Sequence, residues 1–426
     1  MGRRCRCAET EGGGCRRHCL ERDPELNLAD RGLRMEIEMK TRSSLWKVLA
    51  VALGVLLIAA CGGAPSATSP EATEQQPTGI EPSVVPQEPV EATAAPFEVC
   101  FMYDGPANDG GYVQSQDEGR QYMEAQLANV VTRYVESVGA GADAERVLTQ
   151  FAETGCDAII ATSYTYAEAT AAVAERYPEI IFENEDTYLL AENIGAYRMR
   201  IDQPYYLVGM MFGLLTETNE IGFVAPFPIP QVLRSLNSLT LGARSVNPEA
   251  TVSVVWTGSW FDPAREREAV DSFVALGADA VGHYTAGPAI LGAAQANNVY
   301  SHGASADQCF LAPDICVASA TYAWGPHYLN IVSSMLDGTW VSQDYWGTMQ
   351  DGGTAITEYG PFIPDEVAAI VDAKRDEFLA GSTDVFVGPV WDRDGNLRVA
   401  EGETLGTNGL ISLDWVVEGV IGDIPQ

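Results

Sequence analysis

The stretch that decides the fold is Tyr103-Asp104-Gly105-Pro106-Ala107-Asn108-Asp109-Gly110-Gly111-Tyr112. It follows an apolar run, Phe97–Tyr103, that predicts a buried strand, and a helical pattern then extends from Tyr112 to about Leu127. The stretch is therefore a strand-to-helix loop. In open α/β sheets ligands bind at the carboxyl ends of strands, so this loop is a candidate binding site.

The side chains of this loop suit a flat heterocycle. Asn108 supplies a donor and an acceptor, Asp109 supplies acceptors, and Tyr112 supplies an aromatic face. Gly110 and Gly111 allow a tight turn and a close approach of the backbone. An Asx turn that caps the following helix explains Asn-Asp-Gly-Gly equally well without any ligand. The loop alone leaves both interpretations open.

Strand and helix patterns alternate along the rest of the body. Strands are predicted at 97–103, 130–137, 157–162, 179–183, 193–197, 220–225, 251–256, 279–283 and 299–303. Helices are predicted at 143–154, 166–177, 203–217, 230–246, 263–276 and 288–297. This alternation predicts an α/β fold with parallel sheets covered by helices on both faces. The pattern restarts after Thr218, which predicts two α/β lobes with a hinged cleft between them.

Candidate cleft residues occur at other strand ends. Trp260 follows the strand that ends at Trp256 and is expected to form an aromatic wall opposite Tyr112, although a tryptophan packed on the rim of the core explains it too. Ser163 and Tyr164 end a strand of the first lobe, where Tyr164 either lines the cleft or packs. His283 and His302 are interpreted as structural, because no Cys, His or carboxylate spacing supports a metal site.

Charge excludes one class of partner. The whole chain has 426 residues, and the part past residue 60 holds 14 basic and 51 acidic side chains, a formal net charge of −37. Lys374 is the only lysine in that part. Such a surface repels phosphate backbones, so nucleic-acid binding is not expected.

Residues 40–61 have the order of an export signal. A charged segment precedes the apolar run Val48–Ala60, which is too short for a stable transmembrane helix, and Cys61 follows. Ile58-Ala59-Ala60-Cys61 resembles a bacterial lipobox, which implies cleavage before Cys61 and a lipid on its thiol. An ordinary signal peptide or a buried helix is the alternative. We expect an exported protein anchored by lipid to the outer face of the bacterial cell membrane.

The segments on either side of this signal are not expected to belong to the folded body. Four cysteines and a histidine within residues 1–34 superficially suggest zinc ligands, but a mis-extended start before a signal sequence that begins near Met35 or Met39 accounts for them better. Residues 61–96 are rich in Pro, Glu, Thr, Ser and Ala and predict a disordered tether.

The remaining cysteines lie in the body. Cys100 and Cys156 have apolar surroundings and are expected to be core thiols. Cys309 and Cys316 flank a short loop of an exported chain, where either a disulfide or two free thiols would fit.

Enzyme signatures are missing from the sequence. It contains no Gly-x-Ser-x-Gly elbow, no His-Glu-x-x-His, no Walker loop and no dinucleotide fingerprint in the expected place. The run 392–396, Asp-Arg-Asp-Gly-Asn, resembles a calcium loop, but the apolar segments on either side, Val385–Val390 and Leu397–Val399, predict a hairpin turn between two short strands. The sequence thus predicts no enzyme, no metal and no cofactor.

Several separated blocks together resemble one family. They are Gly105–Gly119, Phe227–Pro230, Leu241–Pro248, Trp256–Glu268, Trp324–Pro326, Leu336–Trp340 and Asp414–Gly419. In this order they resemble the basic membrane protein (BMP) family of ABC-transporter substrate-binding lipoproteins, whose members bind purine nucleosides or related bases. The similarity extends from about Phe97 to Gly422.

The resemblance implies a fold similar to type I periplasmic binding proteins, with the ligand between two Rossmann-like lobes joined by three crossovers. We expect one lobe at 97–218 and about 320–350, and the other at 219–319 and about 351–426. The ligand-binding residues expected from the loop chemistry and the resemblance are Asn108, Asp109, Tyr112, Ser163, Tyr164, Trp260, Asp307 and Trp324.

Two departures from the family bear on the ligand. The family's Gly-x-Asp-x-Asp loop aligns with Gly303–Asp307, where Ser305 replaces the first aspartate. A lysine that the family tends to carry is also absent from the aligned residues 319–324. Both lost groups suit ribose hydroxyls, and each unpaired hydroxyl would cost about 1–3 kcal/mol.

The expected function is therefore capture of a purine in the cleft and its delivery to an ABC permease and ATPase, with a free base such as adenine favoured. The alternatives are a purine nucleoside receptor, a sensory lipoprotein that signals to a membrane partner and, from a different class, a purine-processing hydrolase.

Overall fold

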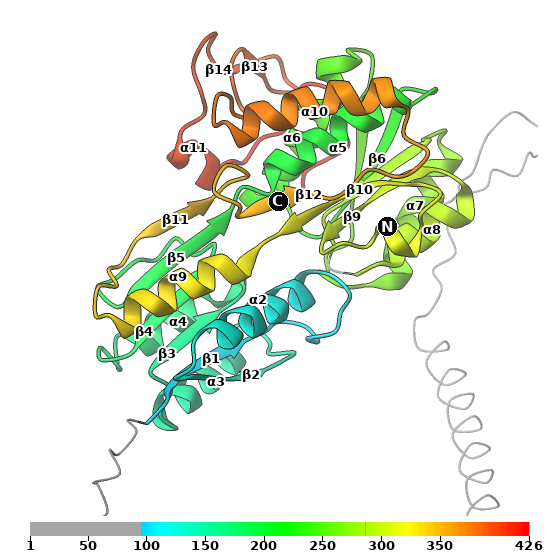
Figure 1. Ribbon diagram of the computed structural model, residues 1–426. Coiled ribbons are helices and arrows are strands. Elements are labelled where there is room, and N and C mark those ends of the chain that lie inside the picture. The colour runs from blue at the N-terminus through cyan, green and yellow to red at the C-terminus, as the bar shows by residue number, and fades with distance from the viewer. Residues whose placement is uncertain (1–94, 286, 426) are drawn as a thin grey trace, which may run out of the picture. The chain divides into compact units, whose positions relative to one another are not determined.

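The computed structural model of this protein describes residues 95–285 and 287–425 (Figure 1). The expected start extension, the signal segment with Cys61 and nearly all of the tether lie outside the described residues. Within these residues, no helix is long and apolar enough to cross a membrane.

The first sheet has six strands, all paired in parallel, in the order β11-β5-β4-β3-β1-β2. Its strands are β1 (Phe97–Met102), β2 (Val130–Val135), β3 (Ala158–Ala161), β4 (Ile181–Glu185), β5 (Ile194–Met199) and β11 (Asp344–Gly347). Its helices are α2 (Tyr112–Gln126), α3 (Ala142–Glu153), η2 (Tyr164–Tyr166), α4 (Ala167–Ala174) and α9 (Trp324–Leu336). Successive residues of β1 point to opposite faces. Val99 and Phe101 pack with α2 and α9, while Cys100 and Met102 pack with α3 and α4.

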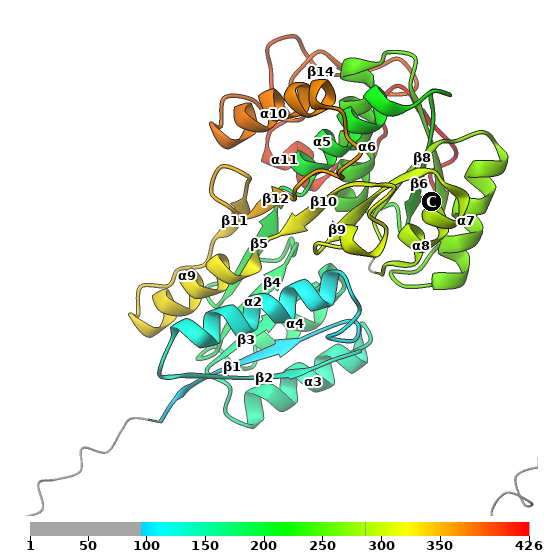
Figure 2. The ribbon, with the colours of Figure 1, turned by 45° about the vertical axis from the view of Figure 1, so that its right-hand side comes forward.

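The second sheet has seven strands in the order β12-β10-β9-β8-β6-β7-β15, and only β12 is antiparallel to its neighbour. Its strands are β6 (Glu220–Ala225), β7 (Thr251–Trp256), β8 (Ala280–His283), β9 (Tyr300–Ser305), β10 (Cys316–Tyr322), β12 (Thr354–Ile356) and β15 (Val420–Ile421). Its helices are α5 (Asp202–Leu215), α6 (Pro230–Val246), α7 (Pro263–Ala275), α8 (Ala289–Asn297), η3 (Cys309–Leu311), α10 (Asp365–Leu379) and α11 (Thr407–Ile411). Helices α5 and α6 pack in one core cluster and α7 and α8 in another, so both faces are covered (Figure 2).

The chain passes between the sheets three times, after β5, after β10 and after β11. Helix α5 packs against α6 in the core of the second sheet. A Cβ atom at Gly209 on α5 would lie 2.0 Å from the Leu239 carbonyl oxygen on α6, so the two helix backbones are in close contact. We therefore propose a first crossover near residue 200 rather than the expected 218.

The predicted βαβ alternation is confirmed. Each predicted strand and helix is present, with ends displaced by a few residues. The hairpin is confirmed as well: β13 (Val390–Trp391) pairs antiparallel with β14 (Leu397–Val399), and the Asp392 carboxylate accepts hydrogen bonds from the Asp394 and Asn396 backbone N–H groups. His283 and His302 are buried and hydrogen-bond to each other's backbone, in agreement with a structural role.

The expectation for Cys100 and Cys156 is wrong, because they form a disulfide. Cys100 is on β1 and Cys156 lies just before β3, and these neighbouring parallel strands bring the Cα atoms to 6.0 Å. The apolar surroundings that indicated core thiols are those of a buried disulfide. Cys309 and Cys316 form a second disulfide, which is one of the two alternatives for this pair.

The two disulfides should contribute unequally to stability, because they close loops of different length. The sequence separations are 56 and 7 residues. Chain entropy predicts contributions of about 4 kcal/mol for Cys100–Cys156 and about 2 kcal/mol for Cys309–Cys316. Urea unfolding of the two double Cys→Ala variants measures both. An equal loss of unfolding free energy would contradict this dependence on loop length.

Candidate ligand-binding site

One cavity lies between the carboxyl edges of the two sheets. Its lining comes from connections that follow strands of both lobes. The lining residues are Asp104, Gly105, Pro106, Asp109, Tyr112, Val113, Ser163, Tyr164, Glu185, Tyr205, Gln231, Trp260, Phe261, Tyr284, Thr285 and Ser305. Parallel strands end at the same edge of a sheet, which is why segments distant in sequence meet here.

Tyr112 and Trp260 both line this cavity, one from each lobe. The Tyr112 ring lies edge-on to Tyr322 and Trp324, at centroid distances of 5.7 and 6.0 Å. Its hydroxyl donates to the Thr162 carbonyl oxygen at 3.0 Å. Trp260 packs against the Phe227 ring at 5.5 Å. Both rings are thus fixed by neighbours that are not part of the cavity lining.

The structure places Asn108 and Asp109 differently with respect to the cavity. Asp109 lines the cavity, but its carboxylate accepts hydrogen bonds from the backbone N–H groups of Gly111, Val113 and Gln114, at 2.8 to 3.0 Å. This is the helix-capping Asx arrangement left open by the sequence. Asn108 is exposed and is not part of the lining.

Two further expected residues also lie outside the lining. Trp324 is 1% exposed, and its indole N–H donates to the Ser115 hydroxyl at 3.0 Å, because α9 packs on α2 in the core of the first lobe. Asp307 is exposed and accepts hydrogen bonds from the Cys309 backbone N–H and the Ser319 hydroxyl. Ser163 and Tyr164 line the cavity.

Sequence reasoning missed two acidic groups of the cavity, Asp104 and Glu185. Each lies at the carboxyl end of a first-lobe strand, Asp104 two residues after β1 and Glu185 as the last residue of β4. This position at a strand end was the sequence signal that could have identified both residues. Asp104 belongs to the stretch that decides the fold, and the β4 prediction stopped at 183, two residues short of Glu185.

Burial dominates the electrostatics of both groups. It raises the pKa of Asp104 to about 6, and the nearby Asp109 carboxylate adds to the rise. Glu185 is 5% exposed, and burial raises its pKa well above the ordinary value. Asp186 and Asp104 raise it further, while Arg198 and Arg234 oppose the rise.

These two arginines do not pair with Glu185. The Arg198 guanidinium donates to Asp186 at 2.7 Å, and Arg234, from the second lobe, lies 3.4 Å from the same carboxylate. Among the described residues, the Glu185 carboxyl group has no hydrogen-bond or ion-pair partner. The part of the cavity lining that the structure describes also contains no Lys, Arg or His. The cavity therefore offers aromatic faces and carboxyl groups.

The raised pKa of Asp104 predicts a pH-dependent effect of Asp104→Asn. The folded pKa lies above the ordinary value of 3.8, so the ionised form destabilises the fold. This cost is absent below about pH 4 and complete above about pH 6. The variant should be more stable than the parent by about 1–3 kcal/mol at pH 8, with the gain shrinking to nothing by pH 4. Urea unfolding at several pH values measures this, and a gain independent of pH would contradict it.

Comparison with known proteins identifies relatives of this chain. The chain is 32% identical to "Purine-binding protein BAB2_0673" of Brucella abortus (strain 2308), over 78% of this chain and 94% of that protein. It is 35% identical to "Putative ABC transporter glucose-binding protein TsgA13" of Haloferax volcanii, over 77% of this chain and 81% of that protein.

A solved structure with a similar fold is an ABC transporter system solute-binding protein from Aeropyrum pernix K1. It aligns with a TM-score of 0.60 at 18% identity, over 69% of this chain and 94% of that chain, which shows the fold alone. Residues 97–380 match the family described as "ABC transporter substrate-binding protein PnrA-like". This chain therefore belongs to the Bmp family of ABC transporter substrate-binding proteins.

Proposed function

We propose that this protein captures a free purine base, with adenine favoured, in the interlobe cavity and delivers it to an ABC permease. The observation that carries the proposal is the pair of fixed aromatic rings, Tyr112 and Trp260, which reach one cavity from different lobes beside two carboxyl groups without cationic partners. A flat heterocycle can stack between two such rings, and this stacking does not depend on which of its ring atoms are nitrogen. The carboxyl groups then select ligands by the hydrogen-bonding groups on the edge of the ring.

Carboxyl groups favour a ligand edge that carries N–H donors. Adenine has an amino group and a ring N–H, and both match Asp104 and Glu185 as acceptors. A Glu185 carboxyl group that is protonated can also donate to a ring nitrogen. Phosphate is disfavoured, because the lining brings acidic and no basic side chains to the ligand. This supports a base or nucleoside over a nucleotide.

Ser305 supports the free base over the nucleoside. It lines the cavity at the position where the resemblance leads us to expect an aspartate. Its single hydroxyl replaces a carboxylate that could accept from two ribose hydroxyls. A buried ribose would then lack partners, at about 1–3 kcal/mol for each unpaired group.

A sugar is the second candidate. It is favoured by the Haloferax volcanii relative, which is named as a putative glucose-binding protein. Carboxyl groups accept hydrogen bonds from sugar hydroxyls as well as from N–H groups. Two flat rings beside the cavity argue more strongly for a planar ligand.

We also propose that the protein is exported and held at the membrane by a lipid on Cys61. The support is the order of charged segment, apolar run and lipobox-like Ile58-Ala59-Ala60-Cys61 in the sequence. A tether of some 35 residues before β1 would leave the binding lobes free to reach a permease.

Calorimetry on residues 62–426 tests the ligand class. Adenine should bind with a dissociation constant in the micromolar range or below, which corresponds to about −8 kcal/mol. Adenosine, guanosine, hypoxanthine and glucose are the comparisons. Tighter binding of adenosine than of adenine would remove the free-base proposal, and binding of glucose alone would replace the purine by a sugar.

The aromatic pair can be tested by substitution. Trp260→Ala and Tyr112→Ala should each weaken adenine binding by about 1–3 kcal/mol, roughly fivefold to 150-fold, because each removes one stacking face. Trp391→Ala is the matched control, since Trp391 is 44% exposed on β13 and is not part of the cavity lining. An unchanged affinity in Trp260→Ala would contradict the stacking account.

A further inference from the structure

Gln308 makes a direct hydrogen bond between the two lobes. It lies on the loop after β9 in the second lobe, and its side-chain N–H donates to the Gly110 carbonyl oxygen of the first lobe at 2.5 Å. The residue is 1% exposed. It does not line the cavity, although Ser305 at the start of the same loop and Asp109 beside Gly110 both do.

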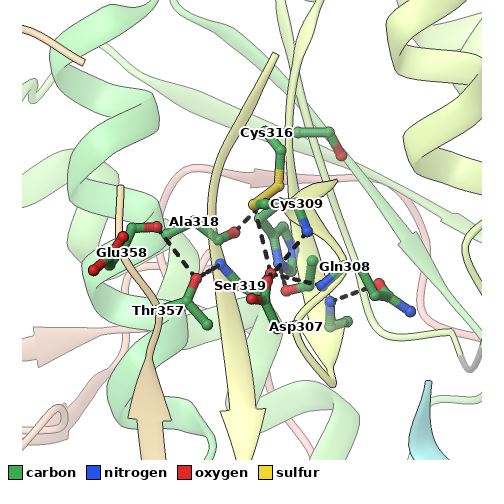
Figure 3. The surroundings of a disulfide bond; sticks show 12 residues. Asp307, Gln308, Cys309, Cys316, Ala318, Ser319, Thr357 and Glu358 are labelled. Carbon is green, nitrogen blue, oxygen red and sulfur yellow. Dashed lines mark hydrogen bonds between the residues drawn. A yellow bond between two sulfur atoms is a disulfide. The ribbon is translucent and has the colours of Figure 1, made fainter. Parts of the chain in front are cut away.

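Gln308 is held firmly by the second lobe. Its side-chain oxygen accepts from the Ala304 backbone N–H at 3.0 Å, and its own backbone N–H donates to the Ser319 hydroxyl at 3.1 Å. The next residue, Cys309, is bonded to Cys316 at the start of β10 (Figure 3). The Ser319 hydroxyl also donates to Asp307, so the whole loop is tied to β10.

The acceptor is held equally firmly by the first lobe. Gly110 has a left-handed backbone with φ +79°, which glycine adopts without strain. Its neighbours are fixed because the Asp109 carboxylate binds three backbone N–H groups at the start of α2. Each end of the Gln308–Gly110 bond therefore belongs to a rigid local structure of a different lobe.

We propose that Gln308 is a positioning residue that latches the two lobes together over the ligand cavity. The chain crosses between lobes after β5, β10 and β11, none of which includes Gly110 or Gln308. When the lobes separate at these crossovers, the Gln308–Gly110 bond must break. The latch thus favours the closed arrangement and slows ligand release. Only the identity of the ligand rests on the proposed function.

Gln308→Glu separates the latch from the local fold, because it keeps the oxygen that accepts from Ala304 and, when ionised, replaces the donor to Gly110 by a second oxygen; Gln308→Met removes the donor in any protonation state. In the full chain without ligand, hydrogen–deuterium exchange of residues 105–116 should become about three- to tenfold faster, although the substitution lies in the other lobe. Dissociation of adenine should accelerate by a similar factor, as expected for the loss of one hydrogen bond. Gln295→Glu, on the exposed surface of α8, should change neither quantity.

Unchanged exchange of residues 105–116 in Gln308→Met, which has no donor in any protonation state, would overturn the proposal, since a purely local role would affect only residues 303–309. If Gln308→Glu lowers the melting temperature of the chain without ligand, Gln308→Met, which has similar length and no donor, must give the same faster exchange. Failure of the parent chain to bind adenine would remove the adenine proposal and leave the exchange comparison valid.

Discussion

A carboxyl group that is removed from water must find a hydrogen-bond donor or keep its proton, and this constraint governs the cavity. Asp104 and Glu185 lie at the ends of two buried strands, and burial raises the pKa of both. The neighbouring arginines are engaged with Asp186 instead. The cavity therefore holds polar groups that a donor-bearing ligand can satisfy. The ionised forms of these carboxyl groups lower the stability of the fold, as is common at binding sites.

The fold determines where these carboxyl groups and the other cavity side chains lie. Parallel strands in both sheets end at the edges that face the cavity, so loops from distant parts of the chain contribute side chains to one place. Tyr322 packs edge-on against the Tyr112 ring, and Phe227 packs against the Trp260 ring. The Gln308–Gly110 bond then joins the two lobes beside these residues. The shape of the cavity and the placement of its aromatic rings thus depend on residues outside its lining.

Much of the fold was predictable, because buried parallel strands and amphipathic helices leave distinct patterns in sequence.

The site was predictable only in part. Tyr112 and Trp260 could be identified from their positions after strands. The capping role of Asp109 could not be separated from a ligand contact, because an Asx turn and a ligand contact need the same residue types. Glu185 was missed because β4 continues through the polar residues Glu183 and Asn184 to that glutamate, and polar residues do not indicate a buried strand. Glu183 on the same strand is buried and bonded to the Trp340 indole N–H, a tertiary contact that no local pattern indicates. Cys100 and Cys156 were misassigned for a similar reason, since only the pairing of β1 with β3 brings them together.

The central claim is that a flat nitrogen heterocycle fills the cavity with its donor edge on the carboxyl groups of Asp104 and Glu185. A crystal structure of the chain with adenine tests this most directly. The account predicts the ring between Tyr112 and Trp260, with ligand nitrogen atoms within about 2.7–3.2 Å of Asp104 or Glu185 carboxyl oxygens, the usual N–H···O range. A ligand bound elsewhere, or one whose polar edge faces away from both carboxyl groups, would contradict it.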